Sequence, residues 1–387
     1  MRILYPVPEI LPDPRARFIQ IVNTCCALAE AGNSVALLAG MKPGCTPEDV
    51  CRFYGVPTHP NLEIVRMPIL RREHAAFPRL SWHGVFHWPL LLRILRESFS
   101  GGGKAVLYVR HIKLAEFLLR TRRIAGVPVV FEMHEIFHLS TVNERKREEI
   151  RRREIRIYGE ADAVVTLSGK LKDHLEEMKV SRSGVFVIPH GVRKEWFDVE
   201  RISPGSYLCY VGSLYRWKGV DTLIAAMKFL PGEELVVVGG GERLAELKIM
   251  TEKENVADRV RFAGAVPHAE VPGFLAKAKV CVLPNIAEGP TEFAFPLKLL
   301  EYMAAGVPTV ASDIPIYAEL VRDGKETILV GPGNPESLAS GIRKVVETPR
   351  LAEEMSAASR RTAEGFTYAM RAGRIAEMLK TVPTVSR

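Results

Sequence analysis

Stretches of β-branched and other apolar residues alternate with amphipathic stretches along the first half of the chain. Strands are predicted at residues 1–7, 34–40, 105–110, 127–135, 161–168 and 185–192. Helices are predicted between them at residues 18–31, 113–124, 143–158 and 170–178. Because apolar strands that alternate with helices are typical of a parallel sheet covered on both faces, this half is predicted to form an α/β domain.

A second series of strands and helices begins after the linker at residues 201–205. Strands are predicted at residues 206–214, 234–241, 260–266, 280–285, 308–312 and 328–332, with helices at 220–229, 243–255, 271–278 and 296–305. The fold class is therefore α/β, with two Rossmann-like, doubly wound parallel-sheet domains.

The length and composition agree with two globular domains. A chain of 387 residues exceeds the roughly 250 to 300 residues at which a single core stops growing. Its six cysteines have no CxxC or Cys/His spacing, which predicts no metal site and a reducing compartment. The apolar start of the chain is interrupted at Pro6, and no apolar run approaches the ~18 residues of a spanning helix, so a cytoplasmic location is predicted.

The positive charge is concentrated in the first half of the chain. Of the net charge of +8, a surplus of seven falls in residues 1–200, which hold 30 Lys and Arg against 23 Asp and Glu. Such a surplus attracts anionic lipid headgroups, nucleic acid or phosphorylated substrates, and charge alone does not choose among them.

The loops that follow the strands of the second domain are the places where a ligand is expected, because open α/β sheets bind ligands beyond the carboxyl ends of their strands. These loops are 212–219, 239–242, 266–268 and 285–297. The first, GSLYRWKG, precedes a helix and contains Arg216 and Lys218, which favours an anionic ligand such as a diphosphate. A solvated basic turn is the alternative.

Two further features of this domain bear on ligand binding. The run GGGE at residues 239–242 does not continue as a dinucleotide-binding motif, because Leu244 occupies the position of the third glycine. Lys298 and Glu301 lie three residues apart on the helix that begins near Pro296, hence on one face. There the ammonium suits phosphate and the carboxylate suits ribose hydroxyls, although a surface ion pair has the same spacing.

Several segments of the second domain resemble the family 4 (group 1) glycosyltransferases. They read YVGSLYRWKGVDTLIAAM, VVVGGGERLAEL, DRVRFAGAVPHAEVPGFLAKAKVCVLP and PLKLLEYMAAGVPTVASDIPIYAELV. Upstream, VPVVFEMHE, ADAVVTLSGKLKDHL and VFVIPHGVRKEWF are similar to the first domain of that family. The match covers nearly the whole chain and is specific in its second half.

The resemblance implies a GT-B fold, in which two Rossmann-like domains face each other across a cleft. Here they are residues 1–200, which would bind the acceptor, and 205–365, which would bind the nucleotide sugar, while a last helix at 366–387 would return to the first domain. The implied reaction is retaining, metal-independent transfer of a sugar from a nucleoside diphosphate sugar to a glycan or lipid-linked acceptor in cell-envelope polysaccharide or glycolipid synthesis. No cofactor besides the donor substrate and no nucleic-acid partner is expected.

The resemblance also implies roles for individual residues. Lys218 matches the family's phosphate-binding lysine, and Glu301 matches its ribose-binding glutamate. The arginine that usually follows the loop glycine is Ser213 here, so Arg216 is a substitute candidate. The catalytic candidates are His134, Lys218 and Glu292, and the donor-binding candidates are Gly212, Ser213, Arg216, Lys218, Gly240, Val266, Leu297, Lys298 and Glu301.

The chain departs from the family pattern at three places. The family's sugar-reading glutamate is Phe293 here, with Glu292 beside it, and His190 replaces an asparagine in a loop near the donor. The family's glycine-rich turn after the first strand is replaced by VPEILPDPRARF, where Arg15 and Arg17 could bind an anionic acceptor or form a solvated pair. A satisfied histidine at a strand end is the alternative for His134.

Residues 66–96 interleave aromatic side chains with arginines. This pattern suits peripheral attachment to an anionic membrane surface, on the inner face of the plasma membrane if the acceptor is lipid-linked. A helix pair packed on the first sheet with its arginines outward is an equal alternative. For the whole chain, the alternatives to a transferase are a catalytically weak nucleotide-sugar-binding protein and another GT-B activity such as a sugar epimerase.

Overall fold

The computed structural model describes residues 1–69, 82–99, 104–139, 141, 143–180, 184–202, 204–288 and 293–383. The chain divides into two compact units. The N-terminal unit consists of Met1–Gly191 together with Tyr368–Arg387, and the C-terminal unit is Val192–Thr367. Each unit contains one parallel sheet, of seven and six strands, as expected for a GT-B fold.

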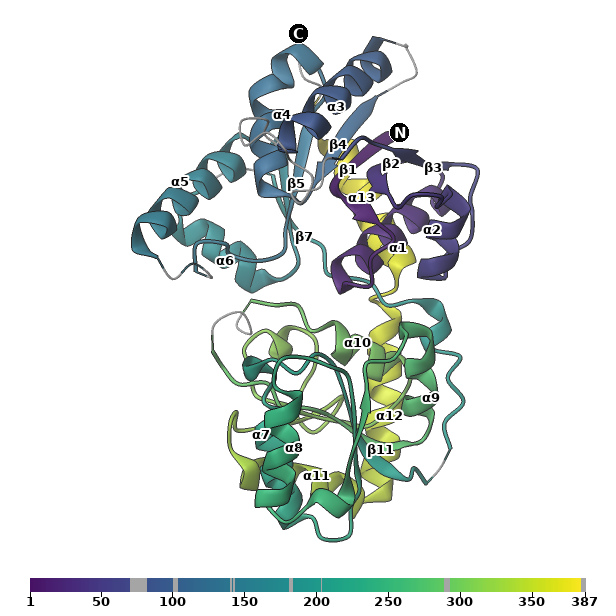
Figure 1. Ribbon diagram of the computed structural model, residues 1–387, viewed down its shortest axis with the longest axis vertical. Coiled ribbons are helices and arrows are strands. Elements are labelled where there is room, and N and C mark those ends of the chain that lie inside the picture. The colour runs from purple at the N-terminus through teal and green to yellow at the C-terminus, as the bar shows by residue number, and fades with distance from the viewer. Residues whose placement is uncertain are drawn as a thin grey trace. The chain divides into compact units, whose positions relative to one another are not determined.

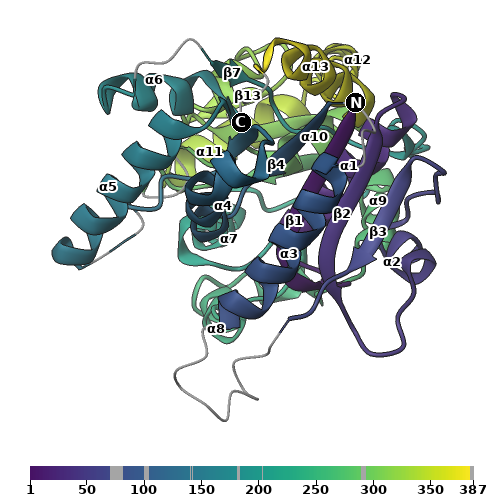
Figure 2. The same cartoon turned by 90° about the horizontal axis from the view of Figure 1, so that it is seen from above.

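The strands of the N-terminal unit are β1 (Arg2–Leu11), β2 (Ser34–Met41), β3 (Leu62–Arg66), β4 (Ala105–Val109), β5 (Val129–Met133), β6 (Ala163–Thr166) and β7 (Val185–Val187). The helices are α1 (Ala16–Glu30), α2 (Pro47–Tyr54), α3 (Trp82–Phe99), α4 (Ile112–Ala125), α5 (Glu144–Glu160), α6 (Gly169–Glu177) and α13 (Tyr368–Thr381). The strand order in the sheet is β3-β2-β1-β4-β5-β6-β7, and β1, β2 and β3 lie side by side in Figure 2.

Alternate residues of these strands form the core beneath α1, α2 and α13. Ile3, Tyr5 and Val7 of β1 pack in one apolar cluster with residues of all three helices, since successive side chains of a strand point to opposite faces. Helix α13 lies beside α1 in Figure 1, although the two helices are the first and the last of the chain. The end of the chain therefore completes the core of its N-terminal unit.

Strand β1 is longer than the sequence predicts. It continues through Pro6 and Pro8 to Leu11, and its pairing with β2 shifts in register between Val7 and Ile10. A proline lacks the N–H that a ladder needs, but a register shift provides places where that donor is not required. The turn predicted for VPEILPDPRARF is therefore wrong in its first half, which is strand.

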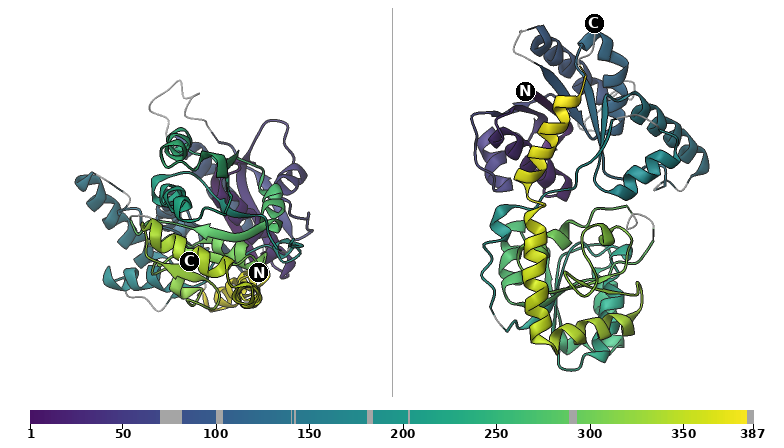
Figure 3. Two further views of the ribbon diagram at one scale, coloured as in Figure 1. Left: turned by 90° about the horizontal axis from the view of Figure 1, so that it is seen from below. Right: turned by 180° about the vertical axis from the view of Figure 1, so that it is seen from behind.

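The strands of the C-terminal unit are β8 (Tyr207–Val211), β9 (Leu235–Val238), β10 (Val260–Gly264), β11 (Ala278–Leu283), β12 (Thr309–Ser312) and β13 (Ile328–Val330). The helices are α7 (Val220–Ala226), α8 (Leu244–Lys253), α9 (Val271–Ala276), α10 (Leu297–Ala304), α11 (Pro335–Val346) and α12 (Pro349–Glu364). The sheet order is β10-β9-β8-β11-β12-β13. Helix α12 is the long yellow-green helix of this unit in the right panel of Figure 3.

The two faces of this sheet are buried under different helices. Cys209 and Val211 of β8 pack in a cluster with α9 and α10, whereas Leu208 and Tyr210 pack in another with α7, α8 and α11. Both faces of β8 are therefore apolar, which explains its unbroken apolar sequence. In the part of the chain that the structure describes, no helix is long and apolar enough to cross a membrane.

Candidate functional site

Backbone hydrogen bonds join the loops at the carboxyl ends of β8, β9 and β10. The N–H of Leu214 donates to the carbonyl of Gly240 at 3.0 Å. The N–H of Gly239 donates to the carbonyl of Gly264 at 2.8 Å. Because β10, β9 and β8 are neighbours in the sheet, these bonds hold the loops together at one edge.

The loop after β11 is joined to the first of these loops by a close backbone approach. The N–H of Ile286 donates to the carbonyl of Trp217 at 3.2 Å. Gly219 has a φ of 66°, and a Cβ atom there would lie 1.9 Å from the carbonyl oxygen of Pro284. Only glycine fits this position, so the tight turn that precedes α7 depends on it.

Gly239 is a second position that requires glycine, while its neighbour Gly240 does not. Gly239 has a φ of 149°, and a Cβ there would lie 1.8 Å from the carbonyl oxygen of Gly212. At Gly240 the nearest atom to an added Cβ is the Ala265 Cβ at 3.5 Å, an ordinary contact. The fold therefore does not require glycine at 240, and an added side chain would enter open space there.

Lys218 presents a cation at this edge of the sheet. It ends a short 3₁₀ turn, Arg216–Lys218, and its ammonium lies 4.0 Å from the ring centroid of Trp217. Among the described residues, no carboxylate forms an ion pair with it. Burial first, and then the charge of Lys298, lower the pKa of Lys218 to about 8. A desolvated cation beside a second cation favours an anionic ligand.

Glu301 lies one helical turn into α10, between two donors. Its Oε2 is 2.7 Å from Nζ of Lys298, and its Oε1 is 3.2 Å from Nε2 of His268. Burial would raise the pKa of Glu301, but Lys298 and His268 outweigh it and lower the pKa to about 2. The carboxylate is therefore ionised at neutral pH and is held in a fixed orientation.

His268 is a contact that sequence reasoning missed. It lies in the loop after β10, and its ring packs edge-on against Trp196 with centroids 5.2 Å apart. The sequence predicts that the loop 266–268 faces a ligand, but no motif or spacing relates His268 to Glu301, 33 positions later. Only the order of strands in the sheet brings β10 and α10 to the same edge.

Ser213 and Arg216 of the loop 212–219 are predicted donor-binding residues, and their surroundings differ. The backbone carbonyl of Ser213 accepts a hydrogen bond from the Tyr210 hydroxyl at 2.8 Å, so this residue is part of the loop's own structure. The side chain of Arg216 is exposed, and no ion pair to it occurs among the described residues. Arg216 is therefore accessible to a ligand, although nothing in the described structure orients it.

The remaining predicted residues of this unit frame α10. Val266 is half-buried against the core beneath α9 and α10, and Leu297 is half-buried at the start of α10. Glu292, the proposed sugar-reading carboxylate, lies outside the described residues. The structure thus brings together predicted residues from all four loops, without describing Glu292.

In the N-terminal unit, His134 follows β5 and contacts the carboxylate of Glu132 through Nε2. Burial, and next the charge of Arg110, lower the pKa of His134 to about 4, with Glu132 acting in the opposite direction. The ring of the buried His190 lies 5.0 Å from that of His134, centroid to centroid. His134 is therefore a neutral ring at pH 7.

Arg15 and Arg17 are not free cations. Arg15 pairs with Asp13 at 2.7 Å, and Arg17 pairs with Glu9. The anion-binding prediction and the solvated-pair alternative both concern these two arginines, and neither includes the carboxylates of the same segment. An anionic acceptor would have to share these guanidinium groups with Asp13 and Glu9.

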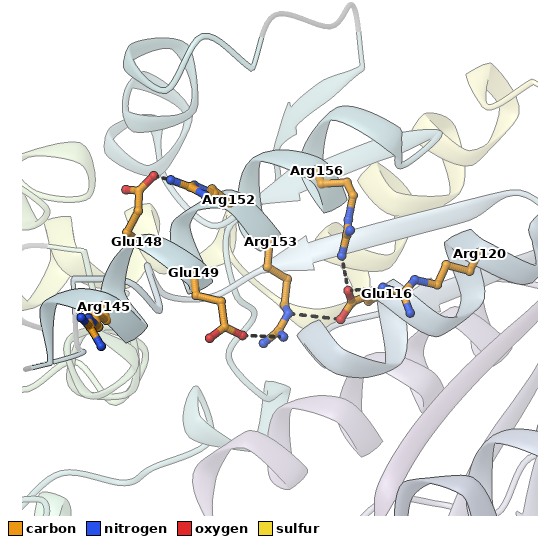
Figure 4. A pocket seen from close by; sticks show the side chains of 8 residues that line it. All are labelled: Glu116, Arg120, Arg145, Glu148, Glu149, Arg152, Arg153 and Arg156. Carbon is orange, nitrogen blue, oxygen red and sulfur yellow. Dashed lines mark hydrogen bonds and ion pairs between the residues drawn. The ribbon is translucent and has the colours of Figure 1, made fainter.

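A hollow between α4 and α5 is lined only by charged side chains (Figure 4): Glu116, Arg120, Arg145, Glu148, Glu149, Arg152, Arg153 and Arg156. Each of its glutamates already pairs with an arginine, as in the 3.1 Å contact between Arg153 and Glu116. None of the predicted site residues lines it. We interpret it as a surface ion-pair network of the kind that contributes little to stability.

The described residues contain no group of three or more His, Cys, Asp or Glu side chains arranged to hold a metal ion.

Comparison with known families identifies both halves of the chain. Residues 19–196 match the model of "Glycosyltransferase Family 4", and residues 192–362 match that of "Glycosyl transferases group 1". The chain belongs to the family 4 (group 1) glycosyltransferases. Group 1 glycosyltransferases use nucleotide-sugar donors.

Relatives of this glycosyltransferase match it over most of its length. Glycogen synthase of Mycobacterium tuberculosis is 26% identical over 386 residues, covering 93% of this chain and 89% of the relative. Sucrose-phosphate synthase of Thermosynechococcus elongatus has the same fold, with a TM-score of 0.75, 21% identity and 98% of each chain covered. HepE of Anabaena, solved in complex with UDP, gives a TM-score of 0.75 at 18% identity, covering 98% of this chain and all (100%) of the other.

Proposed function

We propose that this glycosyltransferase moves a sugar, with retention of anomeric configuration, from a nucleoside diphosphate sugar to a glycan or lipid-linked acceptor in cell-envelope polysaccharide or glycolipid synthesis. The observation that carries the proposal is the desolvated ammonium of Lys218, which lies beside Lys298 and has no carboxylate partner among the described residues. A diphosphate supplies the missing negative charge.

In the proposed reaction, the C-terminal unit binds the donor. Lys218 and Lys298 stabilise the charge that develops on the departing diphosphate, and they do so without a metal ion. The Glu301 carboxylate, held by Lys298 and His268, accepts hydrogen bonds from the ribose hydroxyls. The open backbone at Gly240 admits the nucleotide.

The N-terminal unit is proposed to bind the acceptor and to supply His134 to the reacting sugar. The neutral ring of His134 suits a hydrogen bond to a sugar hydroxyl. Glu292 is proposed as the carboxylate that reads the donor sugar.

The test is turnover of a panel of nucleotide sugars by Lys218→Ala and Glu301→Ala, with Lys228→Ala as the matched control. Lys228 is an exposed lysine of the same unit whose ammonium pairs with Glu254 at 3.3 Å. We expect both site variants to lose turnover and the control to keep it. Full activity in both site variants would contradict the site. A transferase should hydrolyse the donor slowly when no acceptor is present. A wild-type protein that binds the donor and leaves it intact would therefore be a binding protein.

We also propose peripheral attachment to an anionic membrane through residues 66–96, of which 70–81 lie outside the described residues. Support comes from α3, where Trp88 and Leu92 are 63% and 60% exposed and lie four residues apart on one helical face. Apolar surface that is contiguous on one helical face is often buried by binding to a membrane or to another protein.

Co-sedimentation with vesicles containing phosphatidylserine tests this attachment. We expect the wild type to pellet and the double variant Trp88→Ser with Leu92→Ser to remain in the supernatant. Exchange of Ile249, a 70% exposed residue of the C-terminal unit, for serine is the control and should not change the result. Recovery of the wild type in the supernatant would refute the proposal.

A further inference from the structure

Next to His134, the N-terminal unit contains a buried ion pair between Glu132 and Arg371, which has no part in the proposed reaction. Glu132 of β5 is 1% exposed and Arg371 of α13 is 2% exposed. Nη2 of Arg371 lies 2.6 Å from Oε2 of Glu132. Nη1 of the same guanidinium donates to the carbonyls of Ile188 and Pro189 at 2.8 and 2.7 Å. One arginine therefore fixes both the carboxylate and the backbone that leads to His190.

The second oxygen of that carboxylate contacts the histidine. Oε1 of Glu132 meets Nε2 of His134. Although burial alone would raise it, the pKa of Glu132 is held well below its usual range by Arg371 and then by His134. The contact does not have hydrogen-bond geometry in this structure, but an ionised carboxylate can only accept, so a proton on Nε2 is favoured over a lone pair that faces the negative oxygen. In a neutral ring, Nδ1 then carries the free lone pair.

The surroundings of the ring keep it neutral. Arg110 and Arg371 place positive charge near His134, and the ring of the buried His190 lies beside it. Tyr108 of β4 is fully buried next to Glu132, and burial raises its pKa well above the usual value, so it adds no charge. No described residue forms a hydrogen bond with Nδ1 of His134.

We infer that Glu132, clamped by Arg371, is a positioning residue that holds His134 in the Nε2-protonated tautomer and so leaves Nδ1 to accept a hydrogen bond from a hydroxyl of the reacting sugar. This inference rests on the proposed function. In this role His134 accepts a hydrogen bond through Nδ1 and does not act as a proton donor. It also gives the last helix of the chain a part in the reaction, although α13 lies at the opposite end of the sequence from β5.

The substitution Glu132→Gln tests the inference with almost no change of shape. Arg371 can only donate, so the amide oxygen of the new side chain must face it and the amide NH₂ must face Nε2 of His134. Nε2 then has to accept, and the proton moves to Nδ1. Glu132→Asp keeps a group that only accepts and should preserve the wild-type tautomer. Glu135→Gln is the matched control, because it removes an exposed neighbouring carboxylate that is not in contact with the ring.

The tautomer is read by ¹⁵N NMR of histidine-labelled protein at pH 7, with the His134 signal identified by its loss in His134→Phe. We expect protonated Nε2 in the wild type, Glu132→Asp and Glu135→Gln, and protonated Nδ1 in Glu132→Gln. We further expect kcat/KM for the nucleotide sugar to fall about tenfold in Glu132→Gln and to stay unchanged in Glu135→Gln.

Two results would overturn the inference: protonated Nδ1 in the wild type, or unchanged kcat/KM in a Glu132→Gln protein whose tautomer has reversed. The wild-type spectrum decides the first point even if Glu132→Gln does not fold. A wild-type protein that turns over no nucleotide sugar would contradict the proposed function, while the NMR result would still decide the tautomer.

Discussion

Lys218 combines a desolvated ammonium with the absence of a carboxylate partner among the described residues, and its titration should therefore control donor binding. Its pKa of about 8 means that the charged form is lost as the pH rises through 8. If only the ammonium binds a diphosphate, the Kd should weaken about tenfold between pH 7 and pH 9. Calorimetric titration with a nucleoside diphosphate at constant ionic strength measures this change.

Lys218→Arg is the control for that pH dependence. A guanidinium stays protonated in this range, so the weakening above pH 8 should disappear even if the affinity at pH 7 is lower. The same slope in the wild type and in Lys218→Arg would show that another group titrates.

His268 should contribute to nucleotide binding through the carboxylate that it orients. Replacing it by phenylalanine keeps a ring against Trp196 but removes the donor to Oε1 of Glu301. A hydrogen bond to a charged group contributes about 1.5 to 3 kcal/mol, so the Kd for the nucleoside diphosphate should rise roughly ten- to a hundredfold. His268→Gln, which retains a donor, should lose less, and equal losses in the two variants would contradict a role for the hydrogen bond.

At the scale of elements, two adjacent glycines after β9 should respond differently to alanine. A Cβ at 239 would collide with the carbonyl of Gly212, whereas a Cβ at 240 makes only an ordinary contact. We expect Gly239→Ala to lower the melting temperature by several degrees, since strained backbone costs about 1 to 3 kcal/mol. Gly240→Ala should melt like the wild type and bind the donor more weakly, and normal donor binding by Gly240→Ala would remove this residue from the site.

The sequence predicts most strands because a strand buried on both faces is apolar throughout, as in β8 and β9. It does not predict α2 and β3. Strand β3 reads LEIVR, and only Ile64 of its five residues is buried, so it lacks the apolar run on which the prediction depends. The end of β1 was also missed, because Pro8 suggests a turn wherever the register shift is unknown.

The candidate site is predictable from the sequence to the extent that its residues share a loop or a helix. Lys298 and Glu301 follow from helical spacing, and Lys218 follows from its place after a strand. His268 and the pair of Glu132 with Arg371 join residues far apart in sequence, and only the folded sheets bring them together. No local pattern contains that information.

At the scale of the whole molecule, the first residue of the C-terminal unit lies before the linker that the order of strands and helices predicts. The sequence predicts a linker at residues 201–205, and the C-terminal unit begins at Val192. Val192 pairs with Thr367, and Trp196 is buried in the core of that unit. The segment before the linker therefore belongs to the second unit, because an aromatic side chain anchors it there.

The last helix should be essential for the stability of the N-terminal unit. Leu379 of α13 is 1% exposed within the apolar core that also contains α1. Leu379→Ala should cost about 2 to 5 kcal/mol, as expected for a buried leucine. Lys380→Ala is the adjacent control: its ion pair with Glu377 is exposed and should contribute less than about 1 kcal/mol. Denaturant unfolding measures both, and equal midpoints would show that α13 does not stabilise the unit.

The proposed donor site in the C-terminal unit is tested most directly by the thermal unfolding of the wild type and Lys218→Ala with UDP-, GDP-, ADP- and CMP-sugars. A ligand at a hundred times its Kd stabilises the folded state by about 2.7 kcal/mol. We predict that at least one nucleoside diphosphate sugar raises the melting temperature of the wild type by several degrees and leaves that of Lys218→Ala unchanged. An equal rise in both proteins, or no rise with any nucleoside diphosphate sugar, would contradict the site.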